Sequence, residues 1–240
     1  MGGNTDVAGS ELLVTFGDVA EASAVIERFK KPRTDEEIFY ELCFCLCTPQ
    51  TTFKKNIEVL DSLKKFGLFN KMLSADCLNL RYDFLDGKWF SVNARGEENN
   101  IAVVPIPKLE SLLKPVRFYK VKAGCIIKMM EDFFRILHLV RLALQNGHAS
   151  EFNLRTWLVK NVKGLGYKTA SHFLRNLGAD GFAIIDSHIL KYMGVRGKWD
   201  YLEVEKRFRG RAKKYGMTAA ELDAIIWKTY SKTDWEDFSH

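Results

Sequence analysis

Apolar residues recur every three or four positions along most of the chain, which is the spacing of amphipathic helices. Residues 7–29 carry this pattern up to Pro32, and we expect one helix there. Residues 34–37 read Thr-Asp-Glu-Glu, a capping-box sequence, and they precede a mostly apolar segment that Pro49 terminates. A helix of that apolarity is predicted to lie in the core.

Two later segments continue the helical pattern, and the stretch between them interrupts it. Residues 57–66 form a periodic segment that ends at Gly67, and residues 122–144 form a long one rich in Ile, Met, Phe and Leu. Within residues 80–104, LRYDFL and KWFSVNA flank Asp86-Gly87, which predicts a β-hairpin about a two-residue turn. The predicted fold class is all-α with a small β-hairpin.

Residues 150–178 predict two helices joined by a tight turn, a helix-hairpin-helix motif. Ser150 is the expected N-cap of the first helix, and the second helix ends at Gly178. The turn contains Gly164 and Gly166, which permit positive φ and let a ligand approach the backbone closely. Amides at the start of the second helix, together with its positive dipole end, form a site for a phosphate. We therefore expect sequence-independent binding to the DNA backbone.

One lysine and one aspartate stand out in and after this motif. Lys168 lies at the start of the second helix, where the helix dipole opposes the ammonium form, so its pKa should fall if the residue is also partly buried. A partly neutral lysine is a nucleophile able to form a Schiff base. Asp186 ends an apolar run, where an acid is costly unless it is paired or used. The residues alone leave an alternative, namely a surface lysine and an aspartate that caps a helix beginning at Ser187.

The segment from Leu158 to Met193 resembles the helix-hairpin-helix DNA glycosylase superfamily, and most closely the archaeal-type 8-oxoguanine DNA glycosylase/AP lyase family. The resemblance rests on KGLGYK, then ASHFLRN, then an apolar run that ends in Asp-x-His. Weaker matches are ELCFCLCTPQ at 41–50, VRFYKVKA at 116–123 and LDAIIWK at 222–228. Together they cover most of the chain outside the first thirty residues, the stretch at about 68–113, and the last ten residues.

The resemblance implies a catalytic pair. Lys168 is expected to displace the damaged base at C1′, while Asp186 stabilises oxocarbenium-like charge and shuttles a proton. A Schiff base follows, and β-elimination of the 3′-phosphate then nicks the strand. The expected protein is a bifunctional DNA N-glycosylase and abasic-site lyase of base excision repair. We expect it to act as a monomer on double-stranded DNA that contains a damaged base.

The resemblance also suggests residues that contact DNA. Gln50 is placed to fill the gap left by an extruded nucleotide, because an amide can hydrogen-bond the orphaned base. Arg117 is a candidate for contact with the complementary strand, and His188 for contact with a phosphate near the extruded nucleotide. For each of the three, an ordinary surface or helix-end position remains the alternative.

A pocket for an oxidised purine needs an aromatic or apolar plate and a few polar groups at the base edge. Four aromatic residues are candidates, although each is also typical of a core: Phe44, Phe53, Trp227 and Trp235. Family members commonly end with a lysine that helps to hold the base. This chain instead continues beyond Lys232 to His240, which puts that contact in doubt.

The resemblance implies two intertwined helical domains with a cleft for a flipped nucleotide between them. One domain would combine residues 1–34 with 179–240. The other would be barrel-like, comprise residues 35–178 and end in the helix-hairpin-helix. The insertion at about 68–113 departs from the family, whose chains are shorter there. It is either a solvent-facing decoration or a loop that touches DNA.

Composition agrees with DNA binding. The net charge is +6, a moderate basic excess of the kind a phosphate-binding surface needs. The chain has no run of eighteen apolar residues and no basic leader followed by a long apolar core, so we expect neither a membrane span nor a secretory signal.

The cysteines bear on compartment and cofactors. They are odd in number and mostly lie in apolar surroundings, which predicts reduced thiols in a cytoplasmic or nuclear compartment: Cys43, Cys45, Cys47, Cys77 and Cys125. None follows Cys125, so the C-terminal [4Fe–4S] cluster of some superfamily members is not expected. Residues two apart on a helix point in different directions, so Cys43, Cys45 and Cys47 are predicted to be core residues rather than metal ligands.

No cofactor is expected to be required. The backbone carbonyls of Lys160, Val162 and Leu165 match hairpin positions that bind a monovalent or alkaline-earth cation in relatives, and they are the candidate cation site.

Two other function classes remain open beside 8-oxoguanine excision. A superfamily glycosylase for another lesion, such as an oxidised pyrimidine or a mismatched base, would use the same lysine and aspartate. A non-catalytic DNA-binding module would keep the hairpin without a working pocket. Such a module needs neither Lys168 nor Asp186, which argues against it.

Overall fold

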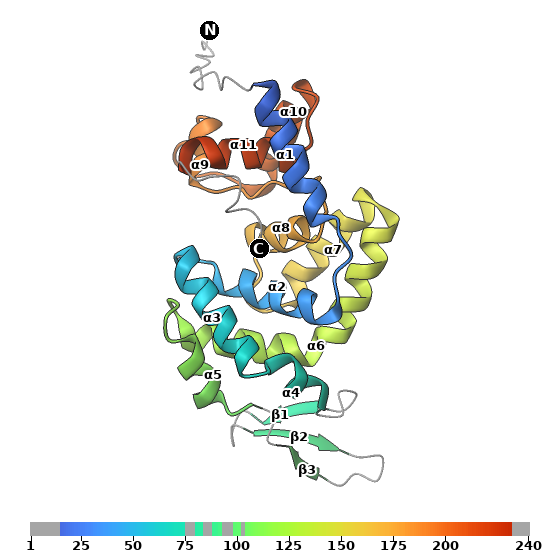
Figure 1. The fold of residues 1–240 in the computed structure, drawn as a ribbon, viewed down its shortest axis with the longest axis vertical. Coiled ribbons are helices and arrows are strands. Elements are labelled where there is room, and N and C mark those ends of the chain that lie inside the picture. The colour runs from blue at the N-terminus through green and yellow to red at the C-terminus, as the bar shows by residue number, and fades with distance from the viewer. Residues whose placement is uncertain (1–14, 75–79, 84–87, 93–97, 102–103, 232–240) are drawn as a thin grey trace.

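The computed structural model describes residues 15–74, 80–83, 88–92, 98–101 and 104–231. Eleven helices and three strands appear in these ranges (Figure 1). The helices are α1 (Phe16–Phe29), α2 (Asp35–Cys47), α3 (Phe53–Lys65), α4 (Leu68–Ser74), α5 (Ile106–Leu113), α6 (Tyr119–Asn146), α7 (His148–Asn161), α8 (Tyr167–Asn176), α9 (Ser187–Tyr192), α10 (Tyr201–Lys214) and α11 (Ala219–Ser231).

Capping boxes start the first two helices. Thr15 has extended backbone (φ −86°, ψ 160°) and exchanges hydrogen bonds with Asp18, so α1 begins at Phe16. The predicted single helix from residue 7 is therefore wrong in its start, and residues 7–14 lie outside the described ranges. The capping box of α2 is confirmed, because the Thr34 hydroxyl accepts from the Glu37 amide and the Glu37 carboxylate accepts from the Thr34 amide.

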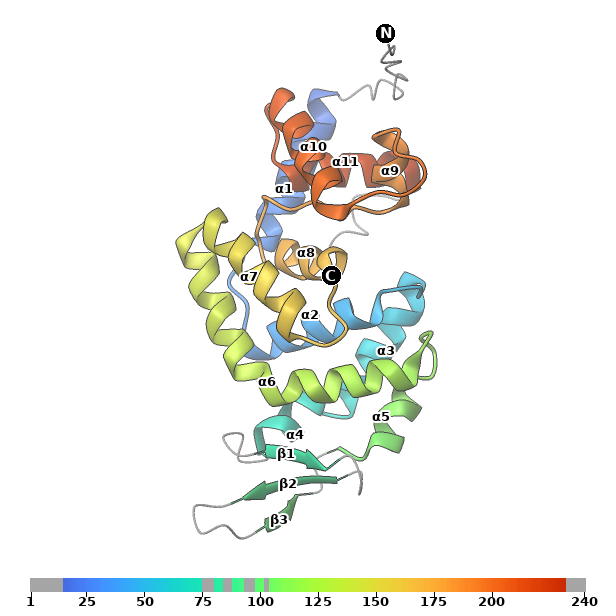
Figure 2. The same ribbon diagram turned by 180° about the vertical axis from the view of Figure 1, so that it is seen from behind.

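The larger hydrophobic cluster is built around α2. This helix contacts α3, α4, α6 and α8. Its side chains are buried from Ile38 to Cys47 except at Glu41, which is partly exposed, so the predicted core position of α2 is confirmed. The long α6 lies along one side of α2, and α7 and α8 follow it as the two helices of the predicted helix-hairpin-helix (Figure 2). The start of α7 differs from the prediction, since its N-cap is Gly147 rather than Ser150.

A smaller hydrophobic cluster joins the two ends of the described chain. It contains α9, α10 and α11, and α1 packs directly against α11. Gly178 shows how closely the connections between the two clusters lie. Its φ is +99°, and a Cβ at this position would lie 2.9 Å from the Cα of Lys30. The segment after α8 therefore runs against the segment after α1. The domain boundaries inferred from the sequence stay a prediction.

The insertion contains a three-stranded antiparallel sheet in the order β1-β2-β3, formed by β1 (Leu80–Asp83), β2 (Lys88–Val92) and β3 (Glu98–Ile101). It lies at the end of the molecule occupied by α4 and α5, away from α9 and α11 (Figures 1 and 2). The prediction had two strands, and the third was not expected. Asp83 pairs with Lys88, and the expected turn at Asp86-Gly87 falls outside the described residues. Among the helices that the structure describes, none is long and apolar enough to span a membrane.

Candidate active site

A cavity of about 410 Å³ is lined by residues from helices that are far apart in the sequence, from α1 to α11. Lys168 of α8 and Asp186, which precedes α9, both line it, so the structure brings the predicted catalytic residues to one site. The other lining residues come from α1, α2, α3, α8 and α11 and from the segments beside them: Phe29, Phe44, Thr48, Thr51, Phe53, Asn56, His172, Arg175, Asn176, Ile184, Asp223 and Trp227.

The hairpin turn places Lys168 in the first turn of α8. Only one of the two turn glycines has positive φ, because Gly164 lies at +93° and Gly166 at −94°. A Cβ on Gly164 would meet Cys125 Sγ at 2.9 Å and Leu46 Cδ2 at 3.1 Å, so packing also requires glycine there. A Cβ on Gly166 would meet no described atom within 4 Å. Of the two glycines, Gly164 alone uses the positive φ that glycine permits, and Gly166 is the one with open space for a ligand.

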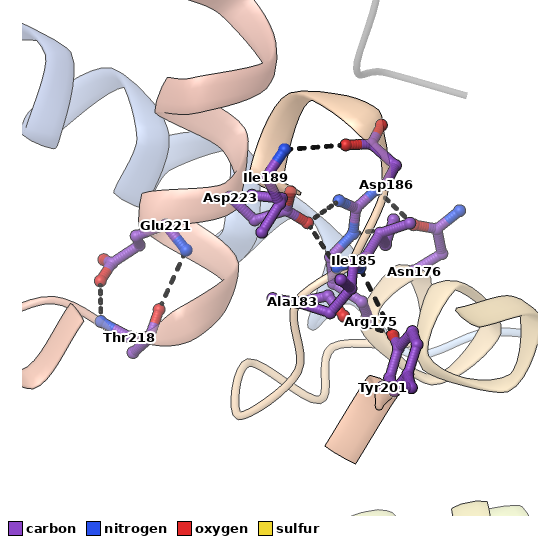
Figure 3. A network of polar contacts seen from close by, with 11 residues as sticks. Arg175, Asn176, Ala183, Ile185, Asp186, Ile189, Tyr201, Thr218, Glu221 and Asp223 are labelled. Atoms are coloured by element: carbon purple, nitrogen blue, oxygen red, sulfur yellow. Dashed lines mark hydrogen bonds and ion pairs between the residues drawn. The ribbon is translucent and has the colours of Figure 1, made fainter. Parts of the chain in front are cut away.

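Asp186 is the N-cap of α9. Its Oδ1 accepts hydrogen bonds from the amides of His188 (2.8 Å) and Ile189 (3.1 Å). Both of these bonds reach Oδ1, and Oδ2 accepts none from the described part of the chain. Figure 3 shows the bond between the Ile189 amide and Asp186. The capping role that the sequence offered as an alternative is therefore present, and it coexists with a position in the cavity wall. The cap fixes the carboxylate and leaves one oxygen for a ligand.

A buried polar network lies beside Asp186 (Figure 3). Asp223 Oδ2 accepts from Arg175 Nη1 (3.0 Å) and from the Ile184 amide (3.0 Å). Burial raises the pKa of the Asp223 carboxyl to about 6, and the charge of Asp186 adds to this rise, while Arg175 and the Ile184 amide oppose it. Arg175 also bonds to Asn176, whose amide donates to Glu41 Oε1 (2.9 Å). The segment that carries Asp186 is thereby tied to α8, α11 and α2.

His172 lies one helical turn after Lys168. Burial lowers the pKa of its imidazole to about 3, and the charges of Arg175 and Lys168 act in the same direction. Its ring meets Phe44 edge to face, with 5.9 Å between the centroids. The cavity wall beside the lysine is therefore a neutral imidazole at ordinary pH.

Three of the four aromatic pocket candidates line the cavity. Phe44 is buried and meets the half-exposed Phe53 edge to face, with centroids 6.1 Å apart. Trp227 reaches the cavity from α11. Trp235 lies outside the described residues. Helices α2, α3 and α11 thus supply aromatic side chains to one cavity, as stacking on a planar base requires.

The three predicted DNA contacts lie outside the cavity lining. Gln50 is exposed in the loop after α2, with φ of +56°. Arg117 is exposed before α6, with its guanidinium over the ring of Phe118 at 4.8 Å. The His188 ring stacks on Tyr230 with 6.1 Å between centroids. Their contacts with DNA stay predictions.

The cysteines behave as core residues. Cys43, Cys45, Cys47 and Cys125 are buried, free thiols, and Cys77 lies outside the described ranges. Burial raises the pKa of Cys47 to about 12 and the pKa of Cys43 well above its ordinary value. Within the described ranges, no group of three or more His, Cys, Asp and Glu side chains could hold a metal ion.

The sequence prediction missed most of the polar cavity wall. His172 and Arg175 lie inside the ASHFLRN motif, and Asp223 inside LDAIIWK, yet none was given a role. A usable signal existed for Asp223, because a carboxylate inside an apolar helix must find a partner or a function. Asn56 carried no such signal. Its Nδ2 donates to Phe44 O (3.0 Å) and Thr48 Oγ1 (2.9 Å).

Comparisons with known proteins agree closely with one another. A family model described as 8-oxoguanine DNA glycosylase matches residues 20–82 and 86–217. A protein named 8-oxoguanine DNA glycosylase/AP lyase from Korarchaeum cryptofilum is 31% identical over 219 residues, covering 85% of this chain and 86% of that protein. A protein of the same name from Methanocaldococcus jannaschii is 32% identical over 216 residues, covering 84% and 85%.

Solved structures give the same result. The 8-oxoguanine glycosylase/lyase of Methanocaldococcus jannaschii, in complex with a 15mer DNA containing 8-oxoguanine, has a TM-score of 0.66 and 28% identity, covering 92% of this chain and 93% of that one. The 8-oxoguanine DNA glycosylase of Thermotoga maritima has a TM-score of 0.62 and 26% identity, covering 87% and 88%.

Proposed function

Because the chain belongs to the 8-oxoguanine DNA glycosylase family, we propose that its cavity performs glycosylase and lyase chemistry with Lys168 as the nucleophile and Asp186 as the assisting carboxylate. The protein is a DNA repair enzyme that excises 8-oxoguanine from DNA and cleaves the abasic site that remains.

The observation that carries the proposed mechanism is the shared cavity. Lys168 and Asp186 come from different helices and meet in one space of about 410 Å³. Sites for small organic groups commonly measure about 300–1,000 Å³. A base inside a duplex cannot enter such a cavity, so the substrate nucleotide must leave the base stack. The aromatic faces of Phe44 and Trp227 and the polar edge formed by Arg175 and Asp223 suit a flipped purine.

The proposed reaction uses Lys168, Asp186 and water. The amine of Lys168 attacks C1′ as the bond from C1′ to the base breaks, and the bonding electrons leave with the base, which takes up a proton from water. Asp186 stabilises the positive charge on the sugar and accepts a proton from the attacking nitrogen. Asp186 passes that proton to O4′, so the C1′–O4′ bond breaks and a protonated imine forms between C1′ and Lys168. Water accepts a proton from C2′ as the bond from C3′ to the 3′-phosphate breaks, which cuts the strand, and a second water hydrolyses the imine and releases the lysine.

The hairpin supports this chemistry by holding the backbone of the DNA. The open face at Gly166 and the free amides at the start of α8 would contact a phosphate close to the lysine. His188 is proposed to contact a second phosphate. Gln50 would fill the gap left by the extruded nucleotide, and Arg117 would contact the complementary strand. We propose that the enzyme works as a monomer.

A cation at the hairpin also fits the residues present. In the described chain, none of the backbone hydrogen bonds of turns, loops and caps reaches the carbonyl of Lys160 or Leu165. The Val162 carbonyl accepts one such bond, from the Leu165 amide (3.2 Å). Bound there, a monovalent or alkaline-earth ion would add positive charge beside a DNA phosphate. No step of the reaction depends on it.

The test is trapping of the imine with borohydride on duplexes that carry 8-oxoguanine, uracil, thymine glycol or undamaged guanine. We expect 8-oxoguanine to be excised fastest and guanine scarcely at all. Lys168→Gln should abolish both cleavage and trapping while binding falls modestly, and Lys163→Gln, in the exposed turn, should retain both. Trapping that persists in Lys168→Gln would contradict the nucleophile. Fastest excision of another lesion would overturn the substrate and leave the mechanism standing.

A further inference from the structure

Lys122, in the first turn of α6, is a buried cation that the chemistry above does not use. The residue is 7% exposed, and its ammonium donates three hydrogen bonds, to Cys47 O (2.7 Å), Pro49 O (3.0 Å) and Thr51 Oγ1 (3.0 Å). An ammonium has three protons, so its donor capacity is used entirely. It forms no ion pair with a carboxylate of the described chain.

These contacts argue against a role in binding phosphate. A lysine that holds DNA must present a free N–H to solvent, and Lys122 has none to present. Its partners instead belong to the end of α2 and the loop after it. The Cys47 carbonyl lies in the last turn of α2, where carbonyls lack intrahelical partners and carry the negative end of the helix dipole. Lys122 therefore caps α2 through one contact and holds the loop through two.

The loop that Lys122 holds has a strained backbone. Gln50 lies at φ of +56°, a conformation that costs energy for any residue with a Cβ and persists only where the surroundings enforce it. Among the described residues other than glycine, Phe118 also has a positive φ, of +59°. Its carbonyl accepts from the Lys122 amide (3.0 Å). The same lysine is thus bonded to both strained segments, through its ammonium and through its backbone.

Asn56 fastens the loop from the other side, through its bonds to Phe44 O and Thr48 Oγ1. Between them, α3 and α6 make three polar contacts with the loop and two with the end of α2, while Gln50 itself stays exposed at the tip. A loop clamped in this way presents its exposed side chain in one fixed position. Such fixing is useful where a side chain must enter a gap in a stacked duplex.

We propose that Lys122 is a positioning residue that holds the loop from residue 48 to residue 51 so that Gln50 is preorganised to enter the DNA gap. The proposal rests on the proposed function. It assigns to Lys122 no contact with DNA. Excision is faster because the loop is already ordered before the DNA binds and does not have to be ordered while the nucleotide is extruded.

The test compares Lys122→Met with Lys120→Met. Both variants remove one positive charge from the same end of α6, but Lys120 is exposed and makes none of the hydrogen bonds that hold the loop. Single-turnover excision is measured on 8-oxoguanine opposite cytosine and opposite an abasic site. We expect Lys122→Met to slow excision opposite cytosine on the order of 10-fold to 10²-fold, as small misplacements do. The loss of rate should be smaller opposite the abasic site, where there is no unpaired base for the Gln50 amide to hydrogen-bond.

The salt dependence of binding to undamaged duplex separates positioning from phosphate contact. A residue that neutralises one phosphate lowers the slope of log K against log salt by about 0.9 when it is removed. We expect the slope to stay unchanged in Lys122→Met. A lowered slope with equal losses on both lesion duplexes would overturn the proposal.

A double-mutant cycle with Gln50→Ala excludes a general loss of stability. If Lys122 acts through Gln50, then Lys122→Met adds little further loss in the Gln50→Ala background, whereas independent effects would multiply. Thr51→Val removes one contact of the ammonium and should give a smaller loss of the same kind, even if Lys122→Met folds poorly. Full multiplication in the cycle would refute the proposal, and the Lys168 trapping experiment would be unaffected by that result.

Discussion

The two roles of Asp186 can be separated by one substitution. Asp186→Asn keeps an oxygen that can accept from the amides of His188 and Ile189, and it removes the negative charge. Asparagine and aspartate are similarly good N-caps, whereas alanine in their place costs about 0.5–2 kcal/mol. Loss of the negative charge at the positive end of the α9 dipole lowers the free energy of unfolding by about 0.3–1 kcal/mol. We therefore expect Asp186→Asn to lower the free energy of unfolding by less than about 1 kcal/mol.

The effect on catalysis should be much larger. The carboxylate is proposed to stabilise a positive charge that exists in the transition state and to take up a proton, and an amide does neither. Losses from such groups are on the order of 10² or more in rate, or about 2.7 kcal/mol of transition-state stabilisation. Binding to lesion DNA should change little, because the cavity keeps its shape.

The assay is single-turnover excision of 8-oxoguanine, run beside urea unfolding of the same samples. Asp186→Ala serves as the comparison, since it should lose the helix cap as well as the charge. The expected pattern is an equally slow rate in both variants and a lower unfolding midpoint in the alanine variant alone. An Asp186→Asn enzyme that excises at the wild-type rate would refute the reasoning. A large fall in its stability would show instead that the cap depends on the charge.

Two further predictions concern stability. Glu205 and Arg155 form a buried ion pair between α10 and α7, with side chains 1% and 4% exposed, so Glu205→Gln should cost about 3–5 kcal/mol in urea unfolding by leaving the guanidinium unpaired. The exposed Glu203→Gln on the same helix is the control, and equal effects would contradict the prediction. His172 has its pKa lowered to about 3 when folded and takes up a proton near pH 6.5 when unfolded, so its contribution to stability is present above pH 6.5 and is lost as the pH falls toward 3. Between pH 6.5 and pH 5 wild type should lose about 2 kcal/mol more than His172→Gln in urea unfolding, and parallel losses would show that the imidazole titrates normally.

The helices that the sequence predicted well are those whose signals are local. The Thr34 capping box, the apolar α2 and the glycines around α8 each depend on residues a few positions apart. The start of α1 was missed although its signal was equally local, because the apolar pattern continued upstream and the capping pair of Thr15 and Asp18 was overlooked. The third strand was missed because its sequence, Glu-Asn-Asn-Ile, has no alternating pattern.

The cavity was predictable only in part. The family motifs gave Lys168 and Asp186, and chemistry suggested aromatic walls. The polar wall depends on contacts across long distances in the chain, such as Arg175 with Asp223 and Asn176 with Glu41. No local pattern encodes which buried arginine meets which buried aspartate. The clamp at Lys122 is of the same kind, because its partners lie more than seventy residues earlier.

The packing of α1 against α11 has a consequence for how the protein is made. Val25, Ile26 and Phe29 of α1 are buried together with Ala220 of α11, almost two hundred residues later. At about 5–20 residues per second, a ribosome needs roughly ten seconds or more to reach α11 after α1 has been synthesised. During that time the apolar stripe of α1 has no native partner from its own cluster. Helix α1 is thus made long before the partner that buries it, and its apolar stripe stays open to aggregation until α11 has been synthesised.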